Sequence, residues 1–199
     1  MKRTIAMTAI GKKFITVVSG LPRSGTSMMI AMLEAGGIPI VTDNIRKADE
    51  DNPNGYYEFE PIKQLSRDTS WLVDARGKAV KVIYSLLYFL PKDHDYKVIF
   101  MRRKVHEVIA SQKAMLLRQG AEGSRLDDAR LAQAFCVQLQ KLDTWIRNQD
   151  NFAVLNINHH DVVYASKSAV IEIDRFLGYG LDMDQMVKIV NPAFHRQKR

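Results

Sequence analysis

The sequence predicts an α/β protein with three layers, in which a mostly parallel sheet is covered by helices on both faces. Two observations support this fold class. Short β-branched runs alternate along the chain with longer segments of helical periodicity, and strands that are separated by helices run parallel to one another. The clearest strand run, YKVIFM at 96–101, is apolar almost throughout, as expected for a strand that is buried on both faces.

The expected elements follow in chain order. Strands are expected at residues 14–20, 38–41, 79–84, 96–101 and 152–157. Helices are expected at residues 27–35, 60–70, 85–90, 104–119, 126–147, 168–178 and 182–190. Residues 42–57 carry Asp, Glu, Pro and Gly without periodicity. We therefore expect a long loop there, and long loops in compact domains usually have a function.

The longest expected helix, 126–147, presents one apolar stripe along its length. The stripe consists of Leu131, Phe135, Leu139, Leu142 and Trp145 or Ile146. This spacing predicts packing against the core. Cys136, the single cysteine, lies in the same helix, cannot form an internal disulfide and is expected to be a buried, inert thiol.

Length and composition fit one globular domain over residues 1–199, with an N-terminal arm at 1–13 and a basic tail at 191–199. Hydrophobic residues make up 46% and charged residues 26%, which excludes disordered and low-complexity classes. The longest apolar run, 82–90, is about half as long as a membrane span, and residues 1–13 lack the cleavage site of a secretory signal. With a single cysteine, these features lead us to expect a cytoplasmic protein.

The charge balance favours negatively charged ligands. Lys and Arg number 29 against 22 Asp and Glu, a net charge of +7, which attracts phosphorylated or polyanionic partners at long range. The basic residues are dispersed except at 102–104 and 195–199, and aromatic residues are not interleaved with them. We therefore expect no nucleic-acid partner.

The segment after the first strand has the glycine spacing of a phosphate-binding loop, G-x-x-x-x-G. It reads Gly20, Leu21, Pro22, Arg23, Ser24, Gly25, Thr26 and Ser27. Backbone N–H groups in such a loop, together with the helix dipole, bind a phosphate or sulfate. Where a nucleotide hydrolase has lysine this chain has Thr26, and the cation is Arg23 instead. The alternative is an ordinary tight turn before a helix that begins with Ser and Thr.

The segment GLPRSGTS resembles the phosphosulfate loop of the P-loop sulfotransferases. The run Lys97 to Arg103, followed by Ser111 eight residues later, is similar to the second motif of that family. Weaker similarities lie at 52–58, in a turn found in bacterial members, and in the closing strand and helix at 154–178.

The resemblance implies a P-loop sulfotransferase fold and a transfer reaction. Members of the family move the sulfuryl group of 3′-phosphoadenosine 5′-phosphosulfate to a hydroxyl or amine of a small-molecule acceptor. The loop residues Pro22 to Ser27 would hold the phosphosulfate, and Arg103 and Ser111 would hold the 3′-phosphate. No metal is expected, since the adjacent His159 and His160 cannot both be presented from one helix face.

The family pattern is incomplete where the chemistry occurs. Lys81 matches the lysine that contacts the transferring group, but the histidine that serves as base in cytosolic members is missing. The candidates for the base are carboxylates in the acidic region that follows the phosphate loop, namely Glu58, Asp43 and Glu60. We favour Glu58 because its aromatic neighbours can raise the pKa of a carboxyl group, whereas Asp43 is also typical of a turn.

Two other functions fit parts of the sequence. A small-molecule or nucleotide kinase shares the phosphate loop, but it needs a lysine for the β- and γ-phosphates and an acid for Mg²⁺. A binding protein that kept the nucleotide site and lost catalysis is compatible with the missing histidine. The acceptor pocket would be formed by residues 42–70 and 120–130, which carry no recognisable specificity motif.

Overall fold

The computed structural model describes residues 14–43, 45, 49, 55–121 and 127–194. The expected arm at 1–13, residues 195–199 of the basic tail and residues 52–54 of the expected turn lie outside the described residues. No helix within the described ranges has the length and hydrophobicity that crossing a bilayer requires.

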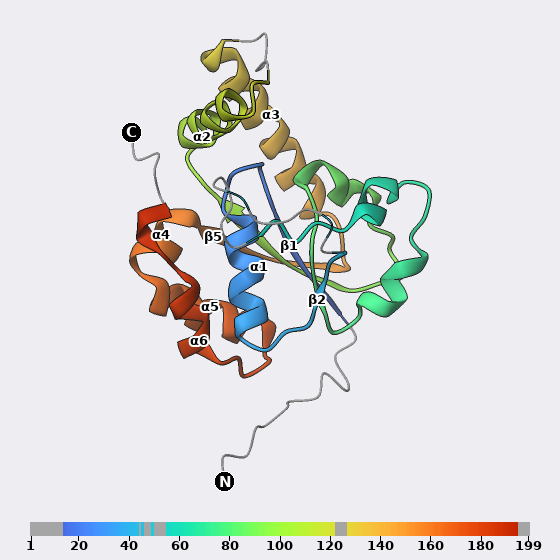
Figure 1. The fold of residues 1–199 in the computed structure, drawn as a ribbon. Coiled ribbons are helices and arrows are strands. Elements are labelled where there is room, and N and C mark those ends of the chain that lie inside the picture. Colours follow the sequence, from blue (N-terminus) through green and yellow to red (C-terminus); the bar gives the residue numbers. More distant parts are fainter. Residues whose placement is uncertain (1–13, 44, 46–48, 50–54, 122–126, 195–199) are drawn as a thin grey trace.

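The chain folds around a five-stranded parallel sheet with the strand order β2-β3-β1-β4-β5 (Figure 1). The strands are β1 (Ile15–Gly20), β2 (Ile40–Val41), β3 (Ala79–Lys81), β4 (Tyr96–Arg102) and β5 (Phe152–Asn158). All of β1 is buried, because it lies in the middle of the sheet and is covered on both faces. The predicted fold class is confirmed.

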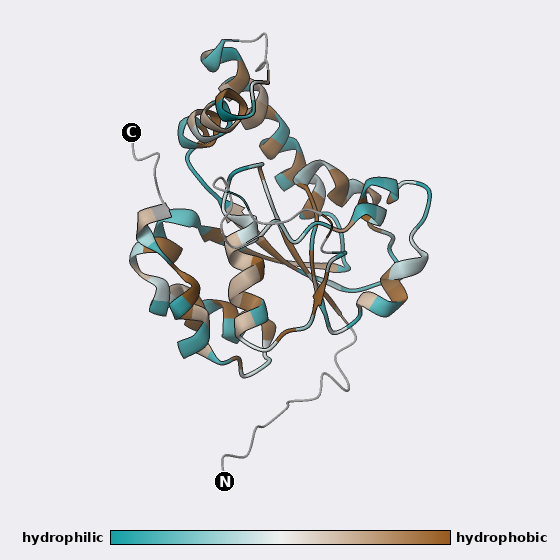
Figure 2. Cartoon of the chain, viewed as in Figure 1, coloured by the Kyte–Doolittle hydropathy of each residue, from teal (hydrophilic) through white to brown (hydrophobic). Residues whose placement is uncertain are grey.

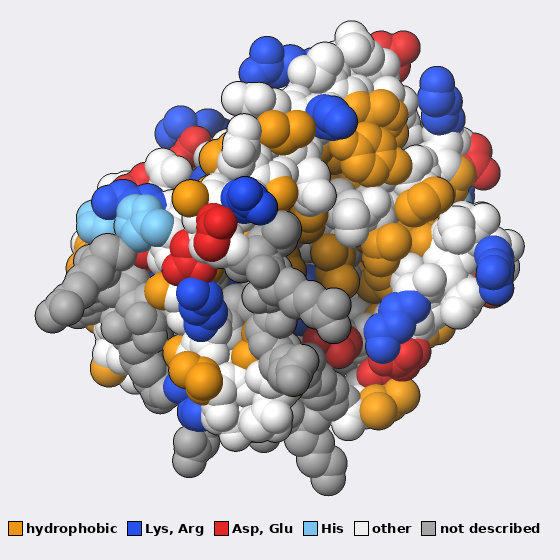
Figure 3. All heavy atoms as spheres, turned by 90° about the horizontal axis from the view of Figure 1, so that it is seen from above, with side chains coloured by type: hydrophobic (Ala, Val, Ile, Leu, Met, Phe, Trp, Pro, Cys, Tyr) orange, Lys and Arg blue, Asp and Glu red, His pale blue; other side chains and the backbone are white. Residues whose placement is uncertain are grey.

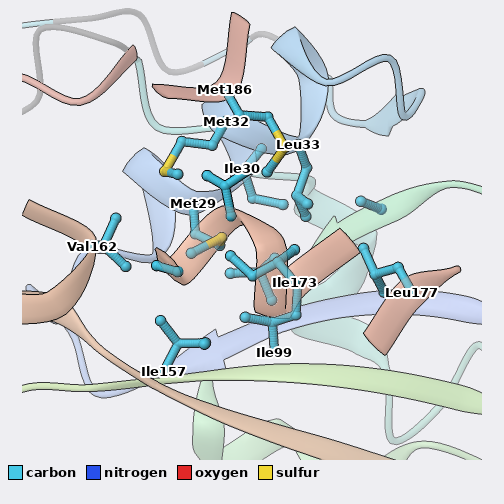
Figure 4. Close-up of a cluster of buried hydrophobic side chains, with 14 of the residues drawn as sticks. Met29, Ile30, Met32, Leu33, Ile99, Ile157, Val162, Ile173, Leu177 and Met186 are labelled. Atoms are coloured by element: carbon cyan, nitrogen blue, oxygen red, sulfur yellow. The ribbon is translucent and has the colours of Figure 1, made fainter. Parts of the chain in front are cut away.

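One face of the sheet packs against α1 (Thr26–Ala35), α4 (His159–Tyr164), α5 (Ser166–Leu177) and α6 (Met183–Ile189). Figure 4 shows Ile30 and Leu33 of α1 meeting Ile99 of β4 and Ile173 of α5. Hydrophobic residues are concentrated in the strands and in α1 (Figure 2). This burial provides most of the driving force that fixes α1, and with it the loop that precedes α1, against the sheet.

The opposite face is covered by short 3₁₀ helices and by one end of α3 (Asp128–Ile146). The 3₁₀ helices are η1 (Glu60–Gln64), η2 (Ser70–Ala75) and η3 (Tyr84–Phe89), and a fourth, η4 (Pro192–Phe194), lies near the end of the chain. The expected helix at 60–70 was therefore wrong in type and in length. Its interruption has a local cause, since the Asp68 carboxylate accepts the Ser70 backbone N–H at 2.9 Å and starts a new turn.

The helices α2 (Val105–Arg118) and α3 form a pair that projects beyond the sheet (Figure 1). Of the predicted stripe on α3, only Leu142 and Ile146 are fully buried, and both lie in the last turns of the helix. Cys136, expected to be buried, is exposed. Both predictions failed for the same reason. A periodic apolar stripe identifies one face of a helix, but it does not show how much of the helix lies beyond the sheet that covers that face.

Candidate functional site

The turn between β1 and α1 has the backbone geometry of an anion cradle. Arg23 has φ of 66° and Gly25 has φ of 97°, so left-handed residues flank Ser24, whose N–H donates to the Leu21 carbonyl at 3.1 Å. Turns of this kind point backbone N–H groups toward one concave side. No acidic residue lies in the first turn of α1, so the positive end of the helix dipole is not neutralised there.

Two glycines are needed for this turn to form. A Cβ atom added to Gly20 would lie 2.5 Å from the Ser24 Oγ and 2.8 Å from the Met101 carbonyl oxygen. A Cβ atom on Gly25 would lie 2.6 Å from the Cδ2 of His159. Since any other residue would force these neighbours apart, the glycine spacing reflects a close approach of three chain segments.

Arg23, Arg103 and Ser111 come together beside the cradle. The Arg23 Nε donates to the Ser111 Oγ at 3.1 Å, and the Arg103 Nη1 donates to the Arg23 carbonyl at 2.9 Å. The first contact joins residues 88 positions apart, and the second joins residues 80 positions apart. The end of β4 and the first turns of α2 therefore hold the cradle from the side.

Arg103 is itself fixed by a buried ion pair. Its Nε lies 3.0 Å from the Glu107 Oε2, and the side chains of Arg103 and Glu107 are 8% and 10% exposed. The preceding arginine, Arg102, pairs instead with Asp143 of α3 and lies over the Phe100 ring at 4.3 Å. The two adjacent arginines thus have separate roles, since Arg103 supports the cradle and Arg102 attaches α3 to the sheet.

Lys81, at the end of β3, reaches the cradle from the other side. Its ammonium donates to the Tyr56 carbonyl and lies 3.4 Å from the Ser27 Oγ. The Ser27 Oγ in turn donates to the same Tyr56 carbonyl at 3.4 Å. Lys81 therefore links the start of α1 to residues 55–59, which follow the acidic loop.

Residues 56 and 57 are anchored through their hydroxyl groups. Tyr56 is buried and donates to the Asp49 carboxylate at 2.7 and 2.8 Å. Tyr57 has φ of 51° and donates to the Glu34 Oε2 of α1 at 2.9 Å. Burial and, secondarily, this hydrogen bond to Glu34 raise the pKa of Tyr57 to about 12.

The structure separates the two favoured candidates for the base. Glu58 lines a cavity above the cradle, and its backbone carbonyl accepts hydrogen bonds from the Thr42 hydroxyl at 3.0 Å and from the Asp43 N–H at 3.2 Å. The Asp43 carboxylate accepts the backbone N–H groups of Ile45 and Glu60, at 3.0 and 2.6 Å. These hydrogen bonds lower the pKa of Asp43, and the one from Ile45 has the larger effect. The Asp43 oxygens therefore hold the turn together and are poorer proton acceptors.

A cavity of about 350 Å³ opens above the cradle at the carboxyl ends of the strands, where open α/β sheets bind ligands. Its walls include the predicted residues Pro22, Arg23, Gly25, Thr26, Ser27, Glu58, Lys81 and Arg103. Ser24 and Ser111 are buried behind this surface, and neither they nor Asp43 line it. Figure 3 looks onto this edge and shows hydrophobic side chains gathered beside charged ones.

Solved sulfotransferase structures share this architecture. Mouse sulfotransferase SULT7A1 complexed with PAP has 18% identity and a TM-score of 0.58, over 89% of this chain and 63% of its own. Sulfotransferase STF1 from Mycobacterium tuberculosis has 16% identity and a TM-score of 0.59, over 92% of this chain and 72% of its own. The chain has the sulfotransferase fold.

A third sulfotransferase-fold structure, retinol dehydratase in complex with androsterone and PAP, has 19% identity and a TM-score of 0.51, over 91% of this chain and 64% of its own. The present chain thus spans less than two thirds of the length of two of these proteins. Neither a protein-family model nor a curated protein sequence matches it.

Sequence reasoning did not identify His159 as a residue of the cavity wall. His159 begins α4 directly after β5, is 7% exposed, lines the cavity and packs against Gly25. The available signal was its position directly after a parallel strand, which places it at the same edge of the sheet as Lys81 and Arg103. In the part of the chain that the structure describes, no group of three His, Cys, Asp or Glu side chains is arranged to hold a metal ion.

The buried Arg103–Glu107 pair predicts a specific pattern of stability. Arg103→Ala leaves the Glu107 carboxylate buried without this cation and should reduce the free energy of unfolding by about 3–5 kcal/mol. The double variant Arg103→Met, Glu107→Leu replaces both charges with apolar groups and should recover most of that loss. Urea denaturation of the three proteins measures both effects. Equal stability of the single and double variants would contradict the assignment.

The Tyr57–Glu34 contact predicts a pH effect. Because the pKa of Tyr57 is raised on folding, its contribution is complete below about pH 10, the pKa of tyrosine in the unfolded chain, and is lost as pH rises toward about 12. Tyr57→Phe removes this ionisation, so the variant should lose less stability than the wild type between about pH 10 and 12. Denaturant midpoints across this range provide the test, and parallel curves would show that Tyr57 titrates normally.

Proposed function

We propose that this protein is a sulfotransferase that moves a sulfuryl group from 3′-phosphoadenosine 5′-phosphosulfate to a small-molecule acceptor. The observation that carries the proposal is the grouping of Arg23, Arg103 and Ser111 around a glycine cradle that has Thr26 in place of a lysine. Such a site offers two phosphate-binding regions, one at backbone N–H groups and one at guanidinium and hydroxyl groups.

The residues present fit such a donor. The close approaches at Gly20 and Gly25 create a concave backbone surface, and the start of α1 adds positive potential. Arg103 and Arg23 line the cavity, and Arg23 binds Ser111, which is buried behind this surface. When bound, the donor would supply an activated sulfuryl group attached to a bisphosphate leaving group.

In this proposal Lys81 and Glu58 have opposite roles. The Lys81 ammonium, which lies beside Ser27, stabilises negative charge that develops on the oxygen linking the sulfuryl group to the leaving group. The Glu58 carboxylate, on the cavity wall, accepts the proton of the acceptor hydroxyl or amine. Sulfuryl transfer depends chiefly on in-line positioning and on charge stabilisation, to which these groups would contribute.

Ligand binding tests the proposal directly. Adenosine 3′,5′-bisphosphate should stabilise the protein more than ATP with Mg²⁺ does. At 100 times its dissociation constant the bisphosphate contributes about 2.7 kcal/mol, a shift of several degrees in Tm. A larger shift with ATP and Mg²⁺ would favour the kinase alternative.

The paired variant Arg103→Met, Glu107→Leu extends this experiment, because it removes the guanidinium while preserving packing. Affinity for the bisphosphate should fall by roughly 10- to 150-fold, as expected for one lost charge-assisted contact, whereas 5′-AMP binding should barely change. Isothermal titration with both ligands measures the ratio. Equal losses would show that Arg103 acts only by supporting the Arg23 carbonyl.

Turnover separates the roles of the two proposed catalytic residues. Lys81→Ala should reduce kcat by about 10²–10³ while bisphosphate binding weakens far less. Glu58→Gln should reduce kcat by about 10²–10⁴. Transfer from radiolabelled donor to pooled hydroxyl and amine metabolites provides the assay. Full activity of Glu58→Gln would exclude Glu58 as the base, and a wild type that binds donor without transfer would indicate a binding protein.

A further inference from the structure

His159 forms part of the cavity wall on the side of β5, away from Lys81. It directly follows β5, begins α4 and is 7% exposed. In the sheet, β1 and β4 lie between β5 and β3, so the imidazole is separated from the place where the proposed transfer occurs. The steps of that transfer give His159 no role, although it is a buried titratable group in the cavity.

The imidazole lies against the cradle at its second glycine. A Cβ atom on Gly25 would be 2.6 Å from the Cδ2 of His159 and 3.5 Å from its Nε2, so the ring edge that carries Nε2 borders this residue. Gly25 is the N-cap of α1, and the backbone N–H groups that begin a helix bind anions. A titratable nitrogen therefore lies next to the position at which the cradle would hold the 5′-phosphate of the donor.

Cations outnumber carboxylates on the wall that His159 shares. The charged residues of this wall are Arg23, Lys63, Lys81, Arg103, Glu58 and Glu60. Glu60 pairs with Lys63 at 2.6 Å. The Glu58 carbonyl accepts the N–H of Asp43, two residues after β2, so Glu58 belongs to the other side of the sheet from β5. The potential around the cradle is therefore positive.

The helices beside His159 do not neutralise this potential. α5 meets α4 through apolar residues, namely Ala169, Val170 and Ile173. The charged residues of α5 are Lys167, Glu172, Asp174 and Arg175. The Asp174 carboxylate accepts the Leu181 N–H at 2.7 Å, and the other three are exposed. On α4 itself, the Asp161 carboxylate lies 3.6 Å from the Nδ1 of the exposed His160. The carboxylates of these two helices are thus engaged with other groups or solvated.

The empty and the occupied cradle favour opposite forms of the imidazole. With the cradle empty, burial disfavours an imidazolium, and the positive potential of the wall disfavours it further. A phosphate dianion beside Gly25 reverses the local potential and can accept a hydrogen bond from an imidazolium, in which both ring nitrogens are donors. Binding of the anion and uptake of a proton are therefore linked, and each strengthens the other.

We propose that His159 is a proton-linked binding residue of the donor site. It is neutral while the cradle is empty. It takes one proton from solvent when the cradle binds the 5′-phosphate of the donor or of the bisphosphate product, and its Nε2–H then donates to that phosphate. Affinity for either nucleotide therefore rises as pH falls through the range around 6.5 in which histidine ordinarily titrates. The inference rests on the proposed sulfotransferase function and adds a pH control to its donor site.

Calorimetry measures the proton directly. Titration with adenosine 3′,5′-bisphosphate at about pH 7, in buffers of different ionisation enthalpy, gives the number of protons taken up per ligand bound. The wild type should take up more protons than His159→Gln, by up to about one per site. His160→Gln is the matched control, because His160 is the adjacent residue, its side chain is 69% exposed and it does not line the cavity. This control should take up as many protons as the wild type.

The pH profile of affinity gives a second readout. Between about pH 8 and pH 6, the affinity of the wild type and of His160→Gln should increase about tenfold relative to that of His159→Gln, within the limit of about tenfold per pH unit for one linked proton. The phosphates of the ligand also titrate in this range, but their contribution is common to the three proteins and cancels in the comparison. Equal proton uptake by His159→Gln and the wild type, or parallel affinity profiles, would overturn the proposal.

Donor binding keeps this inference distinguishable from the proposed function. If the wild type fails to bind the bisphosphate, the sulfotransferase function itself is wrong and the inference falls with it. If all three proteins bind the bisphosphate with the same proton uptake, the donor site stands and the role of His159 is wrong. Should His159→Gln fail to fold, the wild type still decides. Phosphorus NMR of the bound ligand counts the protons on its phosphates, and a total uptake no larger than that count would also overturn the proposal.

Discussion

The site depends on one constrained turn, in which the backbone from Gly20 to Thr26 must bend sharply enough to turn its N–H groups inward. Arg23 adopts a left-handed conformation that costs free energy for a residue with a side chain. The surrounding structure compensates at the same residue, because its carbonyl is held by Arg103 and its guanidinium binds Ser111. The ion pair with Glu107 then fixes Arg103. The strained turn is thus stabilised by the same basic groups that we propose bind the donor.

Parallel strand topology explains how distant residues reach this turn. In the order β3-β1-β4-β5, β1 lies between the strands that end in Lys81 and Arg102. The register pairs Val18 with Lys81 and Gly20 with Met101. The strands therefore bring polar side chains to one edge, because β3 ends in Lys81, Arg103 follows β4 and His159 follows β5. Helices bury the faces, so this edge is where the chain presents several backbone ends and polar side chains together.

Much of this could be predicted because its determinants are local. Strand runs and the glycine spacing are short patterns, and they predicted the sheet and the turn between its first strand and the following helix, whereas the role of Arg103 was implied by the resemblance to a family. What the sequence did not reveal depends on contacts between distant segments. The hydrogen bond from Lys81 to the Tyr56 carbonyl, the approach of His159 to Gly25 and the exposure of Cys136 follow from how the elements pack, which periodicity does not specify.

The position of Lys81 connects the two halves of the site. A lysine within the loop itself would begin α1 and contact only the group that the cradle binds. Lys81 belongs to the neighbouring strand, and its ammonium has three donors, of which one contacts the Tyr56 carbonyl while another faces the Ser27 Oγ. Tyr56 lies two residues before Glu58, so a single cation spans the cradle and the segment that carries the proposed base. Displacing the lysine from the loop to β3 therefore places one charge where donor and acceptor must meet.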